Sequence, residues 1–510
     1  MVNNMSKEQD IGRTNAQQMN IRAARTIADT VKSTLGPMGM DKMLVDGHGN
    51  VIVTNDGATI LREVDVSHPG GKMIAEVAKT QENLCYDGTT STVVLAGALL
   101  GNTESLFARG LHPNVICRGY HEASLMATTY LSNEVAMLAE GREEYLKIAR
   151  TAITGKTLEN ALDKVSELCV SAVEQAGSAE SVRVVSFPGG SLDDSYLFGG
   201  VIVNKDFVLE VEDEKETYRH FMLINTGLDV EKNEENVQVQ IDASSYSSYK
   251  SAGKADLISN AKRIVEAFDN KHGIVFVRDS VNDHVCAFLK KHGIMAVRRT
   301  PESVIRALKR ATDSVIFQTV DDISSYTSTN ITREKHNDVW HLFVSNNTGE
   351  SKEATLVLRG ATSHTLEEVE RGFDDALGVV SLVMANDRIV VGAGNSYARM
   401  AVYLRNHAAQ VGGRAQMAIE AFADALESIP ATIAENAGQD PLDTILEMRH
   451  QLMEGNTSVG PDVENGGVCD VLALGVIEPV ELVRQAVLSA AEVTNAILRI
   501  DDIIARRGME

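Results

Sequence analysis

The stretch Asp87–Ser91 holds the residue types that are best suited to chemistry in this chain. It reads Asp-Gly-Thr-Thr-Ser and runs directly into a small apolar segment, residues 92–99, that has the composition of a helix. The positive end of a helix binds phosphate oxygens through backbone donors, and a carboxylate binds a divalent metal. The string therefore predicts a nucleotide site with Asp87 on the metal. An ordinary N-capping turn has the same composition, so these residues alone leave both interpretations open.

Two turns nearer the N-terminus are candidates for the same chemistry. The segment Leu35–Gly39 ends a helical pattern with two glycines and a proline, which makes either a tight helix stop or a backbone that touches a nucleotide. Asp56 lies between Asn55 and Gly57, at a turn from a strand into a helix. A carboxylate there caps the helix, holds a metal or orients a water, and its position alone does not decide between these roles.

Other glycine-rich or charged strings narrow the choice of nucleotide site. Gly392-Ala393-Gly394 begins a G-x-G-x-x-G pattern, but Tyr397 stands where the last glycine belongs, which argues against a dinucleotide site. No G-x-x-x-x-G-K-[ST] string occurs, which excludes a P-loop ATPase at the level of the motif. Lys156 lies in a loop and is either solvated or in contact with a phosphate. Asp374-Asp375 lie in a helical pattern, where paired acids most often face water.

Length and composition exclude several classes of protein. With 510 residues, of which 44% are hydrophobic, the chain has enough material for several domains with buried cores. A net charge of -23 argues against a nucleic-acid partner, because duplex binding requires a basic face. The five cysteines lie far apart without a C-x-x-C pair, which argues against a disulfide framework or a zinc cluster and favours a reducing environment. The first residues are polar and no apolar run approaches the roughly 20 residues that span a bilayer, so we expect a cytoplasmic protein without signal peptide or anchor.

The elements that must position these residues fall into a helical first part, a mixed middle part and a helical last part. Helical spacing of apolar residues predicts helices over 16–35, 73–81, 92–109, 115–138 and 143–151, and again over 366–384, 396–411, 414–428, 441–453 and 479–506. Strands at 44–45 and 51–53 around the turn 46–50 predict a hairpin, and a further strand is expected at 388–391.

The middle part alternates between strands and helices. Strands are predicted at 182–187, 201–204, 221–225, 237–241, 274–277, 293–297, 314–318, 340–344 and 354–358, and helices over 283–291 and 302–311. The β-α-β-α-β order of residues 274–318 is typical of an α/β core with short parallel strands. Because the first and last parts have the same helical texture, we expect them to form one helical domain into which an α/β domain is inserted.

Several strings, in order along the chain, resemble the signatures of one protein family. Lys32–Leu44 (KSTLGPMGMDKML) and Val53–Leu61 (VTNDGATIL) are similar to two long signatures of the group II chaperonins, the thermosome and TRiC/CCT family. Further segments that look like landmarks of this family are Gly110–Pro113, Gly189–Leu192, Gly293–Arg299, Leu358–Thr362, Ala421–Glu427, Ala434–Gly438 and Leu498–Asp502. The chain is therefore identified as a divergent member of this family.

The resemblance implies an α/β multi-domain fold. Both chain ends, residues 1–139 and 395–510, form a mainly α-helical equatorial domain, and two pieces, 140–203 and 358–394, form a small intermediate domain. An α/β apical domain, 204–357, is inserted at the centre and carries a helical protrusion at about 242–270, where group II members have a built-in lid. The segment Ser244–Tyr249 is more polar than the family pattern leads us to expect, and a plain mobile loop is the open alternative there.

The resemblance also implies roles for individual residues. Asp87 holds Mg2+, while Asp56 and Asp375 position and activate the water that attacks ATP. Lys156 matches the lysine of a loop that senses the γ-phosphate. The other residues implied to contact the nucleotide are Leu35, Gly36, Pro37, Gly57, Gly88, Thr89, Thr90 and Ser91, together with Gly394 and Glu478 on the nucleoside side.

The function implied by the resemblance is that of an ATP-dependent molecular chaperone. Like or paralogous subunits form two stacked rings, and the binding and hydrolysis of Mg-ATP drive the enclosure of non-native polypeptides under the built-in lid. No separate co-chaperonin, nucleic acid or membrane is expected as a partner.

Two departures from the family pattern keep an alternative open. Tyr86 stands where the family usually has glycine before the metal-binding aspartate, and Tyr397 stands where it has an acid. If residue 86 requires a positive φ, a tyrosine there costs on the order of 1 kcal/mol or more. The alternative is thus a structural or regulatory ring subunit with weak or no ATP hydrolysis. A phosphotransferase that uses the same Asp/Thr site is a poorer fit, because no motif for a small-substrate pocket occurs.

Overall fold

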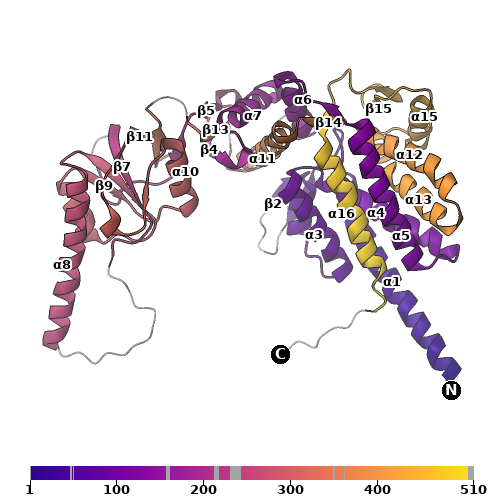
Figure 1. Cartoon of the computed structure of the whole chain (residues 1–510), viewed down its shortest axis with the longest axis horizontal. Helices are drawn as coiled ribbons and strands as arrows, with labels where there is room; N and C mark the ends of the chain where they lie inside the picture. The colour runs from indigo at the N-terminus through magenta and orange to yellow at the C-terminus, as the bar shows by residue number, and fades with distance from the viewer. Residues whose placement is uncertain are drawn as a thin grey trace. The chain divides into compact units, whose positions relative to one another are not determined.

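The polypeptide forms two units, and the second is inserted into the sequence of the first. The computed structural model describes residues 2–45, 47, 49, 51–156, 161–211, 217–229, 243–347, 351–360 and 362–502. The first unit combines Met1–Val170 with Arg371–Glu510, and the second consists of Ser171–Glu370 (Figure 1). Two helices, α7 (Leu162–Ala176) and α11 (Ser363–Asn386), contain the boundaries between the units.

The core of the first unit is organised around α4 (Thr89–Ala108). Its residues are apolar or small on nearly every side, which is typical of a helix that is buried all round. It packs against α1 (Val2–Lys32), α3 (Pro69–Cys85), α5 (Pro113–Tyr130), α13 (Gly413–Leu426) and α16 (Val480–Leu498). Figure 1 shows α16, α4 and α5 running side by side. The residues that begin α4 are therefore held by a rigid helical core.

Shorter elements surround this core. The further helices are α2 (Gly57–Glu63), α6 (Arg142–Ile153), α12 (Asn395–Val411), α14 (Ser428–Asn436) and α15 (Pro441–Met453). The strands form the antiparallel pair β1 (Lys42–Val45) and β2 (Val51–Thr54), the sheet of β17 (Ile477–Pro479), β14 (Arg388–Val391) and β3 (Met137–Leu138), and the pair β15 (Val459–Pro461) and β16 (Val468–Asp470).

Most predicted elements of the first unit are present, but several predicted helices are wrong at their ends. The helix predicted over 16–35 begins at Val2 and ends at Lys32. The hairpin of β1 and β2, helix α15 and strand β14 are confirmed, while residues 46, 48 and 50 of the hairpin turn lie outside the described part. The helix predicted over 115–138 ends at Tyr130, followed by a π-helical turn and by β3, which gains ladder hydrogen bonds to β14. The helix predicted over 414–428 ends at Leu426, because the ring of Pro430 would clash with the carbonyl of that residue in a continuous helix. The helix predicted over 479–506 ends at Leu498, and residues 499–502 are not helical.

The second unit is built on a seven-stranded sheet. Its strand order is β6 (Val201–Val203), β12 (Val339–Ser345), β11 (Thr327–His336), β7 (Thr217–Ile224), β8 (Gly273–Val277) and β9 (Ile294–Val297), and β10 (Ile316–Phe317) also pairs with β7. The strands β7, β8, β9 and β10 are parallel, as the β-α-β alternation predicts. The mostly polar strand β11 was not predicted, and it joins this parallel part to the antiparallel strands β12 and β6.

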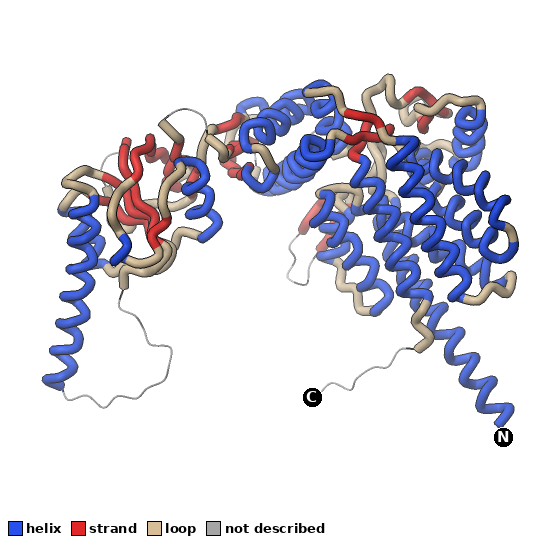
Figure 2. The backbone as a smooth tube through the Cα atoms, in the orientation of Figure 1, coloured by secondary structure: helices blue, strands red, loops and turns tan. Residues whose placement is uncertain are grey.

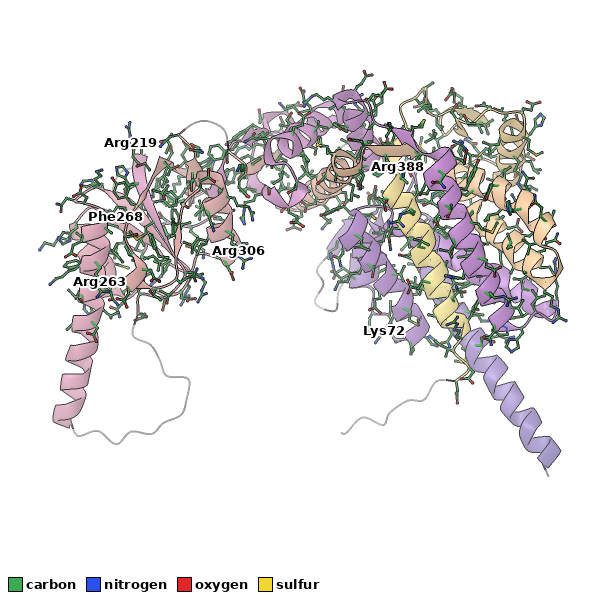
Figure 3. All side chains as sticks on the ribbon, viewed as in Figure 1. Lys72, Arg219, Arg263, Phe268, Arg306 and Arg388 are labelled. Atoms are coloured by element: carbon green, nitrogen blue, oxygen red, sulfur yellow. The ribbon has the colours of Figure 1, made fainter. Side chains whose placement is uncertain are left out.

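Helices cover both faces of this sheet. Along β7, Phe221 and Leu223 pack toward α10 (Glu302–Thr312), whereas Met222 and Ile224 pack toward α8 (Ala243–Ala267) and α9 (Asp283–Lys291). Phe268, directly after α8, is buried against the same face (Figure 3). Figure 2 shows the strands of this sheet with helices on either side. The unit is therefore an α/β domain with a core on each side of its sheet.

The strands predicted at 182–187 and 354–358 are present and belong to a second, smaller sheet. This three-stranded sheet is formed by β4 (Val182–Pro188), β13 (Ala354–Gly360) and β5 (Tyr196–Phe198). The strand predicted at 237–241 lies outside the described residues. Helix α8 begins at Ala243, so the serine-rich segment Ser244–Tyr249 has a helical backbone and is not a plain loop.

Candidate functional site

The Asp87 turn joins α3 to the buried helix α4 in the first unit. Gly88 occupies the N-cap of α4 with a φ of 77°, so the cap offers no side-chain acceptor to the amides of the first turn. Oδ1 of Asp87 accepts a hydrogen bond from the N–H of Gly88 at 2.7 Å. From within the core, Nε2 of Gln81 donates to the carbonyl oxygens of Asp87 and Leu482 at 3.1 and 3.2 Å. The turn is thus fixed by Gln81 while the start of α4 offers N–H donors to a ligand.

Tyr86 ends α3 in a left-handed backbone conformation, with φ 63° and ψ -15°. Its N–H donates to the carbonyl of Glu82 at 2.9 Å, which closes the last turn of the helix. A non-glycine residue in this region costs about 1–3 kcal/mol unless the surroundings compensate for it. Residue 86 therefore has the positive φ at which a tyrosine is predicted to be strained.

The Asp56 turn packs directly on the start of α4. The carboxylate of Asp56 caps α2 by accepting two backbone N–H groups of its first turn, at 3.3 and 2.8 Å. A Cβ placed on Gly57 would lie 2.5 Å from Oγ1 of Thr90 and 3.3 Å from Oγ1 of Thr89. Since only glycine permits this approach, residue 57 brings the Asp56 carboxylate next to the hydroxyls that begin α4.

The loop after α6 lies against the turn that follows α1. A Cβ on Gly155 would lie 3.1 Å from the carbonyl oxygen of Gly36 and 3.1 Å from Cα of Pro37. Nδ2 of Asn55 donates to the carbonyl of Gly155 at 2.6 Å. The Asp56 turn, the Gly36 turn and the Lys156 loop are therefore joined through their backbones.

Lys156 and Asp375 form the central ion pair of the region. Nζ of Lys156 lies 2.5 Å from Oδ2 of Asp375, and the two side chains are 17% and 22% exposed. Burial raises the pKa of Asp375 above its usual range against the effect of Lys156, and Asp87 and Asp56 raise it further. Burial acts to lower the pKa of Lys156, but the three aspartates outweigh it and raise that pKa. Asp374 is exposed, as expected for paired acids on a helix, whereas Asp375 turns inward.

Glu478 and the glycines after β14 form another side of the region. A Cβ on Gly392 would lie 2.9 Å from Oε1 of Glu478, so the glycine lies directly against this carboxylate. Burial and then the charge of Asp87 raise the pKa of Glu478 to about 7, against a hydrogen bond from the N–H of Ala393. Gly394 is the N-cap of α12, with a φ of 75°, and it packs against Pro430.

Tyr397 lies in the first turn of α12 with its side chain buried. Its hydroxyl has no hydrogen-bond partner within the part of the chain that the structure describes. Burial, followed by the charges of Glu478 and Asp87, raises its pKa. A neutral phenol therefore stands beside these two acids, at the position where the family pattern has a third acid.

The structure brings most of the predicted site residues into one region of the first unit. Packing joins Gly57 to the start of α4 and Gly155 to the Gly36 turn, and the ion pair brings in Asp375. Ser91 lies on the first turn of α4 and is partly exposed. Leu35 contributes least, because its side chain is buried and its carbonyl accepts a hydrogen bond from Asn436 at 2.8 Å.

Some residues that shape this region were not predicted. Gln81 was missed, although it stands on the apolar face of α3 with Ile74, Ala78 and Cys85, and a lone polar residue in such a row signals a buried hydrogen bond. Asn55 was not predicted to hold the Lys156 loop. Gly378, in the interior of α11, carries no local signal for the contact that it makes with Tyr86.

The region fits a magnesium nucleotide better than a protein-only metal site. In the described part of the chain, no three His, Cys, Asp or Glu side chains are grouped to hold a metal by themselves. Mg2+ commonly takes one or two carboxylates and completes its shell with waters and phosphate oxygens. Asp87 beside an uncapped helix start, with glycines where a Cβ would fill the space, offers that combination.

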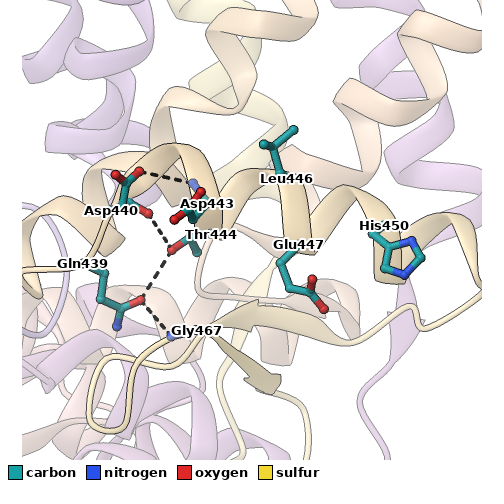
Figure 4. A pocket seen from close by; sticks show the side chains of 8 residues that line it. All are labelled: Gln439, Asp440, Asp443, Thr444, Leu446, Glu447, His450 and Gly467. Atoms are coloured by element: carbon teal, nitrogen blue, oxygen red, sulfur yellow. Dashed lines mark hydrogen bonds between the residues drawn. The ribbon is translucent and has the colours of Figure 1, made fainter.

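An open hollow of about 550 Å3 lies elsewhere in the first unit, on α15 (Figure 4). Its lining includes Asp440, Asp443, Glu447 and His450, and none of the predicted site residues. Asp440 accepts the N–H groups at the start of α15, at 2.8 and 3.2 Å. Asp440 therefore serves as the cap of this helix.

Comparisons with known proteins cover nearly the whole chain. Residues 27–507 match the model of the TCP-1/cpn60 chaperonin family. A thermosome subunit of Methanopyrus kandleri is 40% identical over 510 residues, 98% of this chain and 93% of that protein. Thermosome subunit beta of Archaeoglobus fulgidus is 41% identical, over 99% of this chain and 94% of its own length, and thermosome subunit alpha of Halobacterium salinarum is 39% identical, over 96% and 88%. Among the described residues, no helix has both the length and the apolar composition that a membrane crossing requires.

Proposed function

The chain belongs to the TCP-1/cpn60 chaperonin family, and on this premise we propose that it is an ATP-driven chaperonin subunit. The observation that carries the proposal is the Lys156–Asp375 ion pair, held in the field of Asp56 and Asp87 beside the start of α4. Three acids around one lysine leave a surplus of negative charge, which a bound cation would balance.

The proposed nucleotide site assigns one task to each group of residues. The backbone and hydroxyls of Gly88, Thr89, Thr90 and Ser91 bind phosphate oxygens, and the Leu35–Pro37 turn and Gly57 close around them. Gly394 and Glu478 contact the nucleoside. Asp87 would hold Mg2+, which would supply the charge that stabilises the phosphate oxygens during transfer.

Water activation in this proposal falls to two carboxylates. Asp56 orients the attacking water, and an oxygen of Asp375 accepts its proton. A raised pKa suits Asp375 to this role, because a general base works best when its pKa lies near the operating pH. Lys156 first holds the Asp375 carboxylate and then donates from Nζ to the γ-phosphate, which frees that carboxylate for the water.

We further propose the five-segment layout of equatorial (1–139, 395–510), intermediate (140–203, 358–394) and apical (204–357) parts. The intermediate segment carries Asp375 on α11, so hydrolysis would depend on how this segment lies against the phosphate-binding residues. Like or paralogous subunits would form two stacked rings around non-native polypeptides in the cytoplasm. The protrusion at about 242–270, of which α8 begins at Ala243, would serve as the built-in lid.

A specific observation favours one alternative, a structural or regulatory ring subunit with weak hydrolysis. Tyr86 holds a positive φ immediately before Asp87, and the Tyr397 phenol replaces an acid near the same residue. Each of these tyrosines would weaken the binding of Mg-ATP if the phosphate approaches its side chain.

Steady-state ATP hydrolysis by the purified oligomer separates the two functions. Asp375→Ala removes the proposed base and should lower kcat by about 10²-fold or more, because general bases contribute on this scale. Asp374→Ala is the matched control, since it removes an exposed acid from the adjacent position of the same helix and should keep the wild-type rate. Equal, near-zero rates for wild type and Asp375→Ala would leave only the structural or regulatory function.

A further inference from the structure

The side chain of Tyr86 packs directly on the backbone of α11. A Cβ built on Gly378 would overlap Cβ, Cγ and Cδ1 of Tyr86, so the tyrosine occupies the space where any other residue at 378 has a side chain. Gly378 is buried and lies in the interior of the 24-residue helix α11. The Tyr86–Gly378 contact therefore joins the Asp87 turn to α11 without intervening atoms.

Two unfavourable residues meet at this contact. A tyrosine with a φ of 63° is strained, and a glycine in the middle of a helix weakens it relative to alanine. Neither choice is explained by its own element. Together they are explained by their packing, because the left-handed backbone aims the ring at α11 and the missing Cβ makes room for it.

The contact lies one residue from one proposed site residue and one helical turn from another. Tyr86 directly precedes Asp87. Gly378 follows Asp375 by three residues, so Asp375 and Gly378 lie on nearly the same face of α11. The ring therefore fixes the distance between the metal-binding carboxylate and the proposed base. The Lys156–Asp375 ion pair attaches the same turn of α11 to the site from another element.

We propose that Tyr86 is a positioning residue, whose ring docks α11 against the Asp87 turn and keeps Asp375 in the site before nucleotide binds. This inference rests on the proposed ATPase function. Glycine at residue 86 would relieve the backbone strain but would remove the ring that packs on α11.

A double-mutant cycle tests the contact without reference to activity. Hydrogen–deuterium exchange over residues 371–386 is measured in the nucleotide-free oligomer for wild type, Tyr86→Gly, Gly378→Ala and the double variant. Tyr86→Gly removes the docking, and Gly378→Ala displaces the ring, so each should raise exchange by roughly tenfold.

In the Tyr86→Gly background, Gly378→Ala should raise the exchange of α11 no further. The gain in helix propensity from alanine is the same in both backgrounds and cancels in the cycle. Equal effects of Gly378→Ala in the two backgrounds would overturn the proposal.

Kinetics then test the positioning role. Tyr86→Gly should lower kcat by about tenfold to a hundredfold and leave KM for ATP unchanged, because it misplaces Asp375 without removing a phosphate ligand. Tyr86→Phe keeps the ring and should restore both the rate and the low exchange of α11. A rise in KM with constant kcat, or a Tyr86→Phe variant that behaves like Tyr86→Gly, would contradict the role. If wild type and Asp375→Ala hydrolyse ATP equally slowly, the ATPase proposal fails. The exchange cycle still tests whether the Tyr86–Gly378 contact docks α11.

Discussion

The first unit contains two clusters of buried charge that differ in how their charges are balanced. In the Glu427 network, one carboxylate that is 6% exposed receives the guanidinium groups of Arg405 and Arg449, and Arg405 also binds Asp424 at 2.6 Å. In the candidate site, Lys156 pairs with Asp375 and is also subject to the charges of Asp56 and Asp87. The first cluster has a partner for each charge, whereas the second holds more negative charge than its lysine neutralises.

This difference separates structural from functional electrostatics. A buried ion pair is tolerated when its charges and lone pairs are satisfied within the protein. The Glu427 network meets this condition and joins α12, α13 and α15. In the candidate site, the pKa values of Asp375 and Glu478 are raised and the Tyr397 hydroxyl is left without a partner in the described chain. These perturbed groups support the proposed nucleotide site, because perturbed groups are common in functional sites.

The largest change in stability is expected when the Glu427 network is broken. Glu427→Gln keeps the shape of the side chain but leaves two arginines without their carboxylate. It should destabilise the first unit by about 2–4 kcal/mol, somewhat less than for a fully buried pair because the arginine side chains are 24% and 34% exposed. Hydrogen exchange of α13 amides gives this free energy, and the fluorescence of Trp340 reports the second unit as an internal control.

A surface pair provides the matched comparison for Glu427. Arg25 and Glu104 form an ion pair of 3.1 Å with side chains that are 42% and 41% exposed. Glu104→Gln should cost no more than about 1 kcal/mol. Similar losses for the two variants would mean that the Glu427 network is not the stabilising cluster that its burial indicates.

An intermediate effect is expected from the pH dependence of the unbalanced cluster. The pKa of Glu478 is raised to about 7 in the folded chain, so the folded state holds its proton more tightly than the unfolded state does. Stability is then unaffected below a pH of about 4.5 and falls as pH rises toward 7, because the carboxylate must ionise while partly buried. Glu478→Gln should remove this loss and stabilise the nucleotide-free first unit by about 1–3 kcal/mol at pH 8, with little change at pH 4.5.

Exchange measurements at the two pH values, corrected for the intrinsic exchange rate, test this sign. A variant that is less stable than wild type at pH 8 would show that the Glu478 carboxylate is stabilised by partners in the folded chain. Glu435→Gln is a suitable control, because its side chain is 53% exposed and pairs with Lys32 at the surface. It should show no such difference between the two pH values.

The same contrast explains how much of the molecule could be predicted from its sequence. Helix α15 and strand β14 were predicted with the observed bounds because capping residues and apolar spacing are local signals. The end of α13 was predicted two residues late and α14 was not predicted, because the break between them depends on where Pro430 meets the preceding turn. Strand β11 was missed since it is mostly polar and owes its place to the strands on either side.

For the candidate site, residue types were predictable and contacts were not. Asp56, Asp87 and Asp375 could be chosen by resemblance to a family pattern, and strain at Tyr86 could be predicted conditionally. That Lys156 pairs with Asp375, and that Tyr86 fills the space above Gly378, depends on packing between segments nearly 220 and 300 residues apart. Sequence periodicity contains no information on such distances.

The smallest change in stability is expected for Tyr397→Phe. Its sign shows whether the Tyr397 hydroxyl has a partner within the protein. Its hydroxyl is buried without a partner in the described chain, so Tyr397→Phe removes a polar group that the fold does not satisfy. The nucleotide-free first unit should then be as stable as wild type or more stable by up to about 1 kcal/mol. Thr103→Val is the contrasting variant, because its buried hydroxyl bonds to the carbonyl of Leu99 at 2.8 Å and its loss should cost about 1 kcal/mol. A comparable loss for Tyr397→Phe would mean that the phenol is satisfied within the protein, and the two clusters would then differ only in their charges and not in their readiness for a ligand.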